Sequence, residues 1–189
     1  MKLWNSIRGR STPDVREEPA IAEQPTQPEK AAKRGFKLFG GPHAALCKQL
    51  KSVQANTVLE IGVGDGSRAV AVLETLAKAG QDARYLVIDQ FEMAGGEVTL
   101  MEFHQSLRAA GIRPQVFPQD IANGLVRVSH TIGAVDLIVI GADQANWQNP
   151  DISAKLSRVA HNGTVILYFD GEGWQNHTLA KSAEIRRAA

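Results

Sequence analysis

The sequence of 189 residues contains a single cysteine, Cys47, and no long hydrophobic run. One cysteine excludes an intrachain disulfide, which fits a reducing compartment. No apolar stretch approaches the roughly 20 residues that cross a bilayer as a helix, and the start of the chain lacks the apolar run of a secretory signal peptide. We therefore expect a cytoplasmic protein with no membrane span.

A strong charge of one sign is absent as well. Lys and Arg together number 21 and Asp and Glu number 20, which leaves a formal net charge of +1. This balance provides no bulk attraction to nucleic acid or to an anionic membrane, so we expect no nucleic-acid partner. The chain length and the 43% hydrophobic content suit one globular domain with a real core.

Residues 1–34 differ in composition from the rest of the chain. From residue 11 onward this segment is rich in Pro, Glu, Gln, Ala and Lys and has no apolar periodicity. Such a segment cannot bury enough surface to offset its ordering entropy. We expect a disordered or loosely attached arm over residues 1–34 and a folded domain over residues 35–189. The apolar head of the arm is either an anchor for a partner or for a membrane surface, or a frayed terminus.

Segments typical of strands and helices alternate along the folded domain. Apolar spacing and turn residues predict strands over residues 57–61, 85–88, 115–117, 135–140 and 164–169, and helices over residues 42–53, 67–79, 97–110, 121–130 and 175–189, with one more starting at Asn149. This alternation indicates an α/β fold, a Rossmann-like doubly wound sheet that is mostly parallel. For the expected strand order 3-2-1-4-5, ligands bind where the carboxyl ends of the first and fourth strands meet.

The turn after the first strand carries the strongest functional signal. The strand ends in an acid, Glu60, and three glycines follow at every second position, Gly62, Gly64 and Gly66. Glycine adopts positive φ and lets a ligand approach the backbone, and a helix N-terminus presents free N–H groups. The turn therefore looks like a nucleoside-binding turn, and the alternative is a glycine-rich connection with no ligand.

The spacing of these glycines bears on which nucleoside binds. Dinucleotide enzymes use G-x-G-x-x-G and place a pyrophosphate on the helix N-terminus. Here the third glycine, Gly66, comes one residue earlier, and Glu60 and Asp65 lie beside the turn. Two carboxylates repel a pyrophosphate but suit a ligand that carries an ammonium and a sulfonium group. Arg68, just inside the following helix, either meets an anionic substrate or is solvated.

Acids also follow the second and third strands. Asp89 lies where nucleoside-binding folds place an acid on the ribose hydroxyls, although it can instead be a helix cap or a solvated loop acid. Asp120, beside the apolar Ile121, suits an adenine ring and its exocyclic amine, although Asp120 can simply cap the next helix. After the fourth strand, the small residue Gly141 leaves room for an amino-acid tail.

This order of motifs over residues 58–169 resembles that of the class I S-adenosylmethionine-dependent methyltransferases. In that family the acid after the second strand binds the ribose, the acid after the third meets the adenine amine, and the glycine turn wraps the methionine moiety. The resemblance implies S-adenosylmethionine as cofactor, bound by the residues at these strand ends: Glu60, Gly62, Val63, Gly64, Gly66, Asp89, Gln90, Phe91, Asp120, Ile121 and Gly141.

Within this family the chain is most similar to the small-molecule O-methyltransferases. Their metal-dependent members carry Asp-Ala-Asp-Lys after the fourth strand, where this chain has Gly141-Ala142-Asp143-Gln144. The residue in place of the first metal ligand is thus Gly141, and a hard divalent ion needs several oxygen ligands. We therefore expect no metal, and we expect a small molecule as methyl acceptor.

Two features leave the residues that bind the methyl acceptor unassigned. Too few residues follow the last strand for both a helix and the family's usual C-terminal β-hairpin, so we expect most or all of that hairpin to be lacking. The exposed sheet edge then stays open or is covered by the arm or by the second subunit of a homodimer. Asp143 is the best-placed candidate for a catalytic base, ahead of His104 and His177, but it can equally cap a turn.

The predicted function is transfer of a methyl group from S-adenosylmethionine to a small molecule. The alternative is a non-catalytic relative that serves as a nucleoside-binding or protein-interaction module, which the missing metal ligand and the short C-terminal end favour. A third hypothesis is an aminopropyltransferase-like or NAD-type enzyme. The glycine spacing disfavours NAD, and the segment after the fourth strand carries fewer acidic residues than a polyamine-binding pocket should have.

Overall fold

A computed structural model describes residues 41–142 and 144–178. The predicted arm over residues 1–34 and the candidate base Asp143 lie outside the described residues. Among the described residues, no helix combines the length and the apolar character that crossing a bilayer requires.

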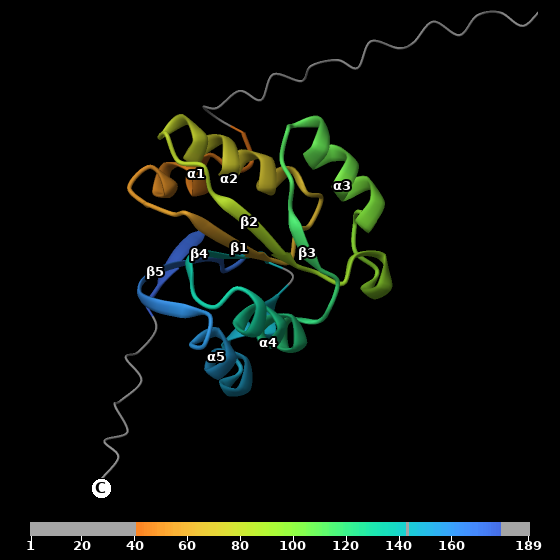
Figure 1. The fold of residues 1–189 in the computed structure, drawn as a ribbon, viewed down its shortest axis with the longest axis vertical. Helices are drawn as coiled ribbons and strands as arrows, with labels where there is room; N and C mark the ends of the chain where they lie inside the picture. Colours follow the sequence, from red (N-terminus) through yellow and green to blue (C-terminus); the bar gives the residue numbers. More distant parts are fainter. Residues whose placement is uncertain (1–40, 143, 179–189) are drawn as a thin grey trace, which may run out of the picture. The chain divides into compact units, whose positions relative to one another are not determined.

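The fold is built on one six-stranded sheet of order β3-β2-β1-β4-β5-β6 (Figure 1). Its first five strands are parallel and have the predicted order, which is confirmed. The sixth pairs antiparallel with the fifth. The strands are β1 (Thr57–Ile61), β2 (Arg84–Ile88), β3 (Gln115–Phe117), β4 (Val135–Ile140), β5 (Ala160–Phe169) and β6 (Trp174–His177).

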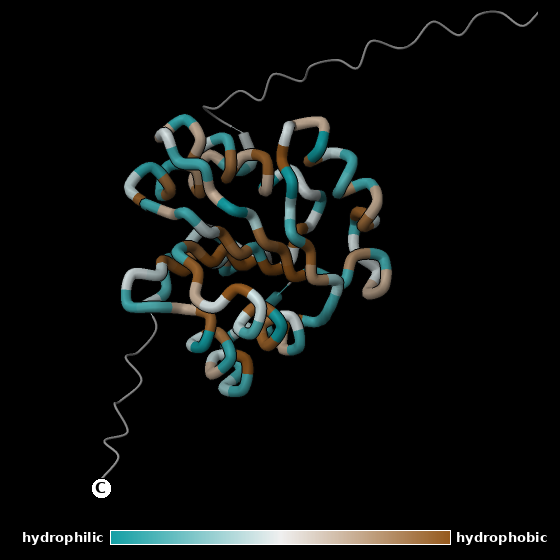
Figure 2. Tube along the Cα trace, viewed as in Figure 1, coloured by the Kyte–Doolittle hydropathy of each residue, from teal (hydrophilic) through white to brown (hydrophobic). Residues whose placement is uncertain are grey.

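Helices cover both faces of this sheet, as the alternation of segments predicts. Figure 1 shows α1 (Ala44–Leu50), α2 (Ser67–Lys78) and α3 (Leu100–Ala109) on one side, and α4 (Ile121–Thr131) and α5 (Pro150–Leu156) on the other. Two short 3₁₀ helices, η1 (Phe91–Ala94) and η2 (Ala145–Gln148), follow β2 and β4. Figure 2 shows the hydrophobic residues concentrated on the central strands.

The alternation of side chains along β1 assigns its residues to two separate cores. Leu59 and Ile61 belong to the core under α4 and α5, whereas Val58 belongs to the core under α1, α2 and α3. Because side chains of a strand alternate between faces, Glu60 lies on the same face as Val58. The single acid of this strand is therefore buried beneath α2.

The predicted helix over residues 175–189 is wrong at its start, because residues 174–177 form the antiparallel strand β6. The cause is a reverse turn held by Asp170, whose Oδ1 accepts hydrogen bonds from the backbone N–H groups of Glu172 (2.9 Å) and Gly173 (2.7 Å). The turn returns the chain along β5, where the Trp174 ring packs on Phe169 at 5.6 Å between centroids. One strand beyond β5 is thus present, and residues 179–189 lie outside the described part of the chain.

Gly124 interrupts the helical pattern of α4, and the structure supplies the reason. A Cβ at this position would lie 2.4 Å from Cγ2 of Ile88 on the facing strand β2. Alanine is favoured over glycine in a helix by about 1 kcal/mol, but overpacking against a stiff β-branched side chain costs about 1–3 kcal/mol. We expect the balance to lower the free energy of unfolding of Gly124→Ala by up to about 2 kcal/mol in urea titrations.

A double-mutant cycle provides the control for Gly124→Ala. Ile88→Ala removes the methyl group that the new Cβ would meet, so the two changes together should cost less than the sum of the single changes. A more stable Gly124→Ala protein would contradict the close approach of α4 to β2.

Candidate functional site

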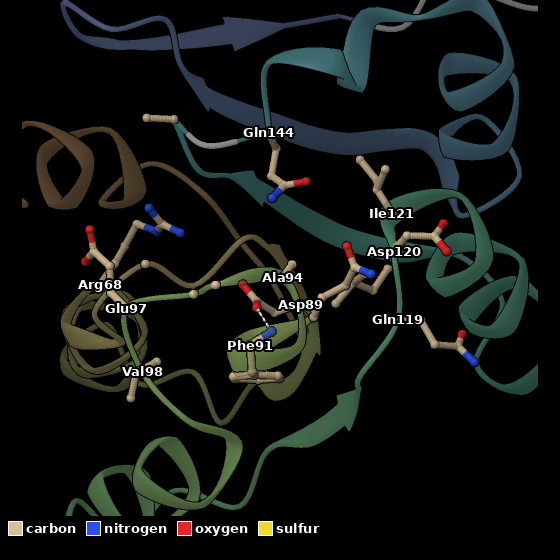
Figure 3. Close-up of a pocket in the computed structure, with 16 residues that line it drawn as sticks. Arg68, Asp89, Phe91, Ala94, Glu97, Val98, Gln119, Asp120, Ile121 and Gln144 are labelled. Carbon is tan, nitrogen blue, oxygen red and sulfur yellow. Dashed lines mark hydrogen bonds between the residues drawn. The ribbon is translucent and has the colours of Figure 1, made fainter.

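A cavity of about 610 Å³ lies at the carboxyl ends of the central parallel strands (Figure 3). This is the edge of the sheet where the sequence predicts the ligand. Each strand end contributes residues to the wall: Gly64 after β1, residues 89–91 after β2, residues 119–121 after β3, and Ala142 and Gln144 after β4. Of the predicted cofactor residues, Gly64, Asp89, Gln90, Phe91, Asp120 and Ile121 line this cavity.

The glycine turn has the backbone conformation that its sequence predicts. Gly62, Gly64 and Gly66 have φ values of 73°, 57° and 78°, in the left-handed region that favours glycine. A Cβ on Gly66 would approach Phe103 at 3.1 Å, whereas a Cβ on Gly64 would meet no atom within 4 Å. Gly64 lines the cavity, so the missing side chain at this position leaves space for a ligand.

Asp89 joins the glycine turn to the loop after β2. One carboxylate oxygen, Oδ2, accepts a hydrogen bond from the backbone N–H of Val63 at 2.8 Å, and Oδ1 accepts one from the backbone N–H of Phe91 (Figure 3). An ionised carboxylate can accept about four hydrogen bonds. Asp89 therefore holds two loops together and keeps the capacity to accept from the two hydroxyls of a ribose.

Phe91 and Gln90 differ in how they contribute to the wall. Phe91 has a positive φ of 51°, is 1% exposed, and packs its ring on Phe103 at 5.4 Å between ring centroids. The residue lines the cavity and is also part of the hydrophobic core. Gln90 is exposed and its side chain remains available at the cavity.

Asp120 has the capping role that the sequence left open, and it lines the cavity as well. It is the N-cap of α4, where Oδ1 accepts from the backbone N–H of Asn123 at 3.0 Å and Oδ2 accepts from the Asn123 amide at 2.6 Å. The hydrogen bond from the Asn123 backbone is the main reason why the pKa of Asp120 lies below its ordinary value. Asp120 is therefore an ionised acceptor beside Ile121 at the end of β3.

The two roles of Asp120 can be separated by substitution. Asp120→Ala removes the N-cap and should lower the free energy of unfolding by about 1 kcal/mol, while Asp120→Ser restores a capping oxygen on a shorter side chain. We expect the serine variant to keep most of the stability but to bind S-adenosylhomocysteine as weakly as the alanine variant. Thermal unfolding and calorimetric titration measure the two effects, and wild-type affinity in Asp120→Ser would show that Asp120 only caps the helix.

Glu60 lies elsewhere than the sequence led us to expect. Its side chain is fully buried and does not line the cavity. Oε1 accepts from Nε of Arg68 at 2.7 Å, and Oε2 accepts from the Tyr85 hydroxyl. Burial raises the pKa of Glu60, and the Arg68 guanidinium and the Tyr85 hydroxyl oppose that rise. Direct contact between Glu60 and a ligand does not fit this geometry.

The other predicted residues of the turn region support the wall from behind. Gly62, Val63, Gly66 and Gly141 are buried and are not part of the cavity lining. The backbone N–H of Gly141 donates to the Ile61 carbonyl at 2.9 Å, which extends the pairing of β1 with β4. These residues hold the strand ends in place rather than facing the cavity.

The candidate bases that the structure describes lie away from the cavity. His104 is half-buried and packs against Phe103, and His177 packs edge-on against Trp147 at 5.0 Å between ring centroids. Trp147 itself is 5% exposed and packs on Tyr168, so it belongs to the core. Within the described ranges, no three His, Cys, Asp or Glu side chains form a group that could hold a metal ion.

Arg68 and Glu97 are wall residues whose role the sequence did not establish. Arg68 is buried rather than solvated, because it neutralises Glu60. A signal for this pairing exists in the sequence: an acid at the end of an otherwise apolar strand requires a partner. Glu97 is the first residue of the helix predicted over residues 97–110, but α3 begins at Leu100, which leaves Glu97 in the preceding loop at the cavity.

No protein-family model matches the chain, and no curated protein matches it significantly. Solved structures do resemble it. One is the O-methyltransferase TomG from Streptomyces achromogenes, which is involved in tomaymycin synthesis and was solved in complex with SAM. It has a TM-score of 0.51 and 19% identity over 68% of this chain and 55% of that chain.

A second similar structure, from Staphylococcus aureus, is provisionally assigned as a caffeoyl-CoA O-methyltransferase. Its TM-score is 0.51 at 14% identity, over 65% of this chain and 54% of that chain. The chain thus spans a little over half the length of these two proteins. The likeness confirms the predicted fold: the chain has the Rossmann-like fold of S-adenosylmethionine-dependent methyltransferases.

Proposed function

We propose that the cavity binds S-adenosylmethionine and that the protein transfers its methyl group to a small-molecule acceptor. The observation that carries the proposal is the pair of carboxylates, Asp89 and Asp120, at the ends of neighbouring strands in one cavity. A ribose diol and an adenine amine are both hydrogen-bond donors, and ionised carboxylates are pure acceptors. The fold supports the same ligand.

The order of the strands gives the ligand its orientation. Neighbouring strands lie about 4.8 Å apart, so the ends of β3, β2 and β1 form three successive positions along the cavity. Asp120 and Ile121 would meet the adenine at the first, Asp89 would accept from the ribose at the second, and Gly64 would leave room for the amino-acid tail at the third. Figure 3 shows Asp120 and Arg68 at opposite ends of the lining, with Asp89 between them.

S-adenosylmethionine would supply the methyl group: a lone pair of the acceptor would attack the methyl carbon in line with the methyl–sulfur bond, which would break and release S-adenosylhomocysteine as the leaving group. The contribution of the chain is to fix the adenosyl group through Asp89 and Asp120, so that proximity and orientation provide most of the acceleration. The acceptor would approach from the loop after β4, where Ala142 and Gln144 line the cavity. Asp143, the candidate base from the sequence, belongs to this loop and lies outside the described residues.

Calorimetric titration tests the cofactor with a matched pair of variants. Asp89→Ala should abolish micromolar binding of S-adenosylmethionine and S-adenosylhomocysteine. Asp136 is the control, because its Oδ2 also accepts from two backbone N–H groups, those of Asn56 and Thr57 at 2.9 Å each, but at the opposite end of the sheet. Asp136→Ala should bind both ligands with wild-type affinity. The proposal would be contradicted if the wild-type protein preferred NAD, or if it bound neither S-adenosylmethionine nor S-adenosylhomocysteine.

The acceptor class requires a separate experiment. Protein incubated with methyl-labelled S-adenosylmethionine and a low-molecular-weight cell extract should transfer label to the small-molecule fraction. Label found only in macromolecules would contradict a small acceptor. Binding of the cofactor with no transfer to either fraction would instead support the non-catalytic module.

A further inference from the structure

Arg68 places a positive charge at the end of the cavity that would hold the amino-acid tail of the ligand. The acid at the end of β1, Glu60, would suit a cationic group. In the structure, Nε of Arg68 is 2.7 Å from Oε1 of Glu60, and Nη2 of Arg68 donates to the Gly62 carbonyl. A guanidinium from the chain itself thus interacts with the acid and the carbonyl that could have received a ligand's ammonium.

The ion pair has a defined direction relative to the cavity. Glu60 is fully buried and absent from the lining, whereas Arg68 forms part of the wall. The pair therefore presents its positive end to the ligand. Inside a protein such a charge acts through a low effective dielectric, so it discriminates strongly between anionic and cationic groups.

The surrounding structure fixes the Arg68 side chain. Its guanidinium carbon lies 5.6 Å from the centroid of the Trp174 ring on β6, and the backbone carbonyl of Trp174 accepts a hydrogen bond from Gln49 of α1 at 2.7 Å. The side chain of Arg68 is 10% exposed. A cation held from several sides in this way cannot readily move away from an approaching ammonium.

We infer that Arg68 selects ligands with a carboxylate at the end opposite the adenine, and this inference rests on the proposed function. The amino-acid tail of S-adenosylmethionine carries both an ammonium and a carboxylate. The Arg68 guanidinium directs the carboxylate toward α2 and turns the ammonium away from Glu60. Glu97 lines the cavity as well and is drawn near Arg68 in Figure 3, so an acidic side chain is also present for the ammonium.

Two ligands that differ by one group test the inference on wild-type protein. S-adenosylhomocysteine carries the carboxylate, and its decarboxylated analogue keeps the amine but has hydrogen in place of the carboxylate. We expect the analogue to bind about tenfold more weakly or worse, as expected for loss of a charge-assisted contact. A site built to receive a cation would bind the analogue equally well or more tightly, and that result would overturn the inference.

The double variant Glu60→Gln/Arg68→Met tests whether Arg68 is responsible. It removes both charges together, so no buried carboxylate is left unpaired, and the affinity ratio of the two ligands should fall toward one. Arg108→Met, at an exposed position of α3, should keep the wild-type ratio. Equal binding of both ligands by wild type overturns this inference and leaves the proposed function standing, whereas no binding of S-adenosylhomocysteine overturns both.

Discussion

Gly64→Ala is expected to weaken binding of S-adenosylhomocysteine by about 30-fold or more, equivalent to about 2 kcal/mol. The new methyl group would point into space that meets no protein atom within 4 Å, at a position on the cavity wall. A ligand tail that lies against the backbone there would have to move, and the contacts of Asp89 and Asp120 would be lost with it. Calorimetric titration measures the loss directly.

Gly80→Ala is the matched control for this prediction. Gly80 has a φ of 78° and also has no atom within 4 Å of its added Cβ, but it lies just beyond the far end of α2 and outside the cavity lining. Both variants force alanine into the left-handed region, at a cost of about 1–2 kcal/mol in stability. If the two variants bound the ligand equally, the ligand would not lie against the glycine turn.

The sequence predicted the central strands well because their signal is local. Buried parallel strands are continuous apolar runs, and the predicted ranges 57–61, 115–117 and 135–140 match β1, β3 and β4. Segment 175–177 was assigned to a helix because nothing in its own composition shows that the preceding turn pairs it with β5. Register against a neighbouring strand is a tertiary property, and in this case it outweighed local preference.

The sequence predicts where in the fold the site lies, but it does not predict which way each side chain points. Asp89 and Asp120 line the cavity because they directly follow parallel strands, a position that topology alone dictates. Glu60 is the penultimate residue of its strand, so alternation turns it beneath α2 rather than toward the ligand. The same alternation brings Tyr85 to it, because Glu60 pairs with Val87 and Tyr85 lies two residues earlier on the same face of β2.

Loss of the buried cation should have the largest effect on stability. Arg68→Met leaves the Glu60 carboxylate buried without its counter-charge, which costs about 3–5 kcal/mol. Lys78→Met, which breaks the exposed ion pair with Glu74, should cost less than about 1 kcal/mol. Urea titration at neutral pH compares the two, and a small effect of Arg68→Met would show that Glu60 is already neutral in the wild-type protein.

The dependence on pH distinguishes an unpaired carboxylate from a simple loss of packing. Burial already raises the pKa of Glu60, and removing Arg68 removes the main effect that opposes the rise. The folded protein then binds this proton more tightly than the unfolded chain, whose glutamate pKa is about 4.3. The stabilisation that this bound proton provides is fully present below that value and is lost as pH rises through the folded-state pKa, by about 1.4 kcal/mol per pH unit.

Relative to wild type, Arg68→Met should therefore be more stable at about pH 5 than at about pH 7. In Glu60→Gln/Arg68→Met this difference should disappear, because the titrating group is gone; a difference that persisted would place the titration on another residue.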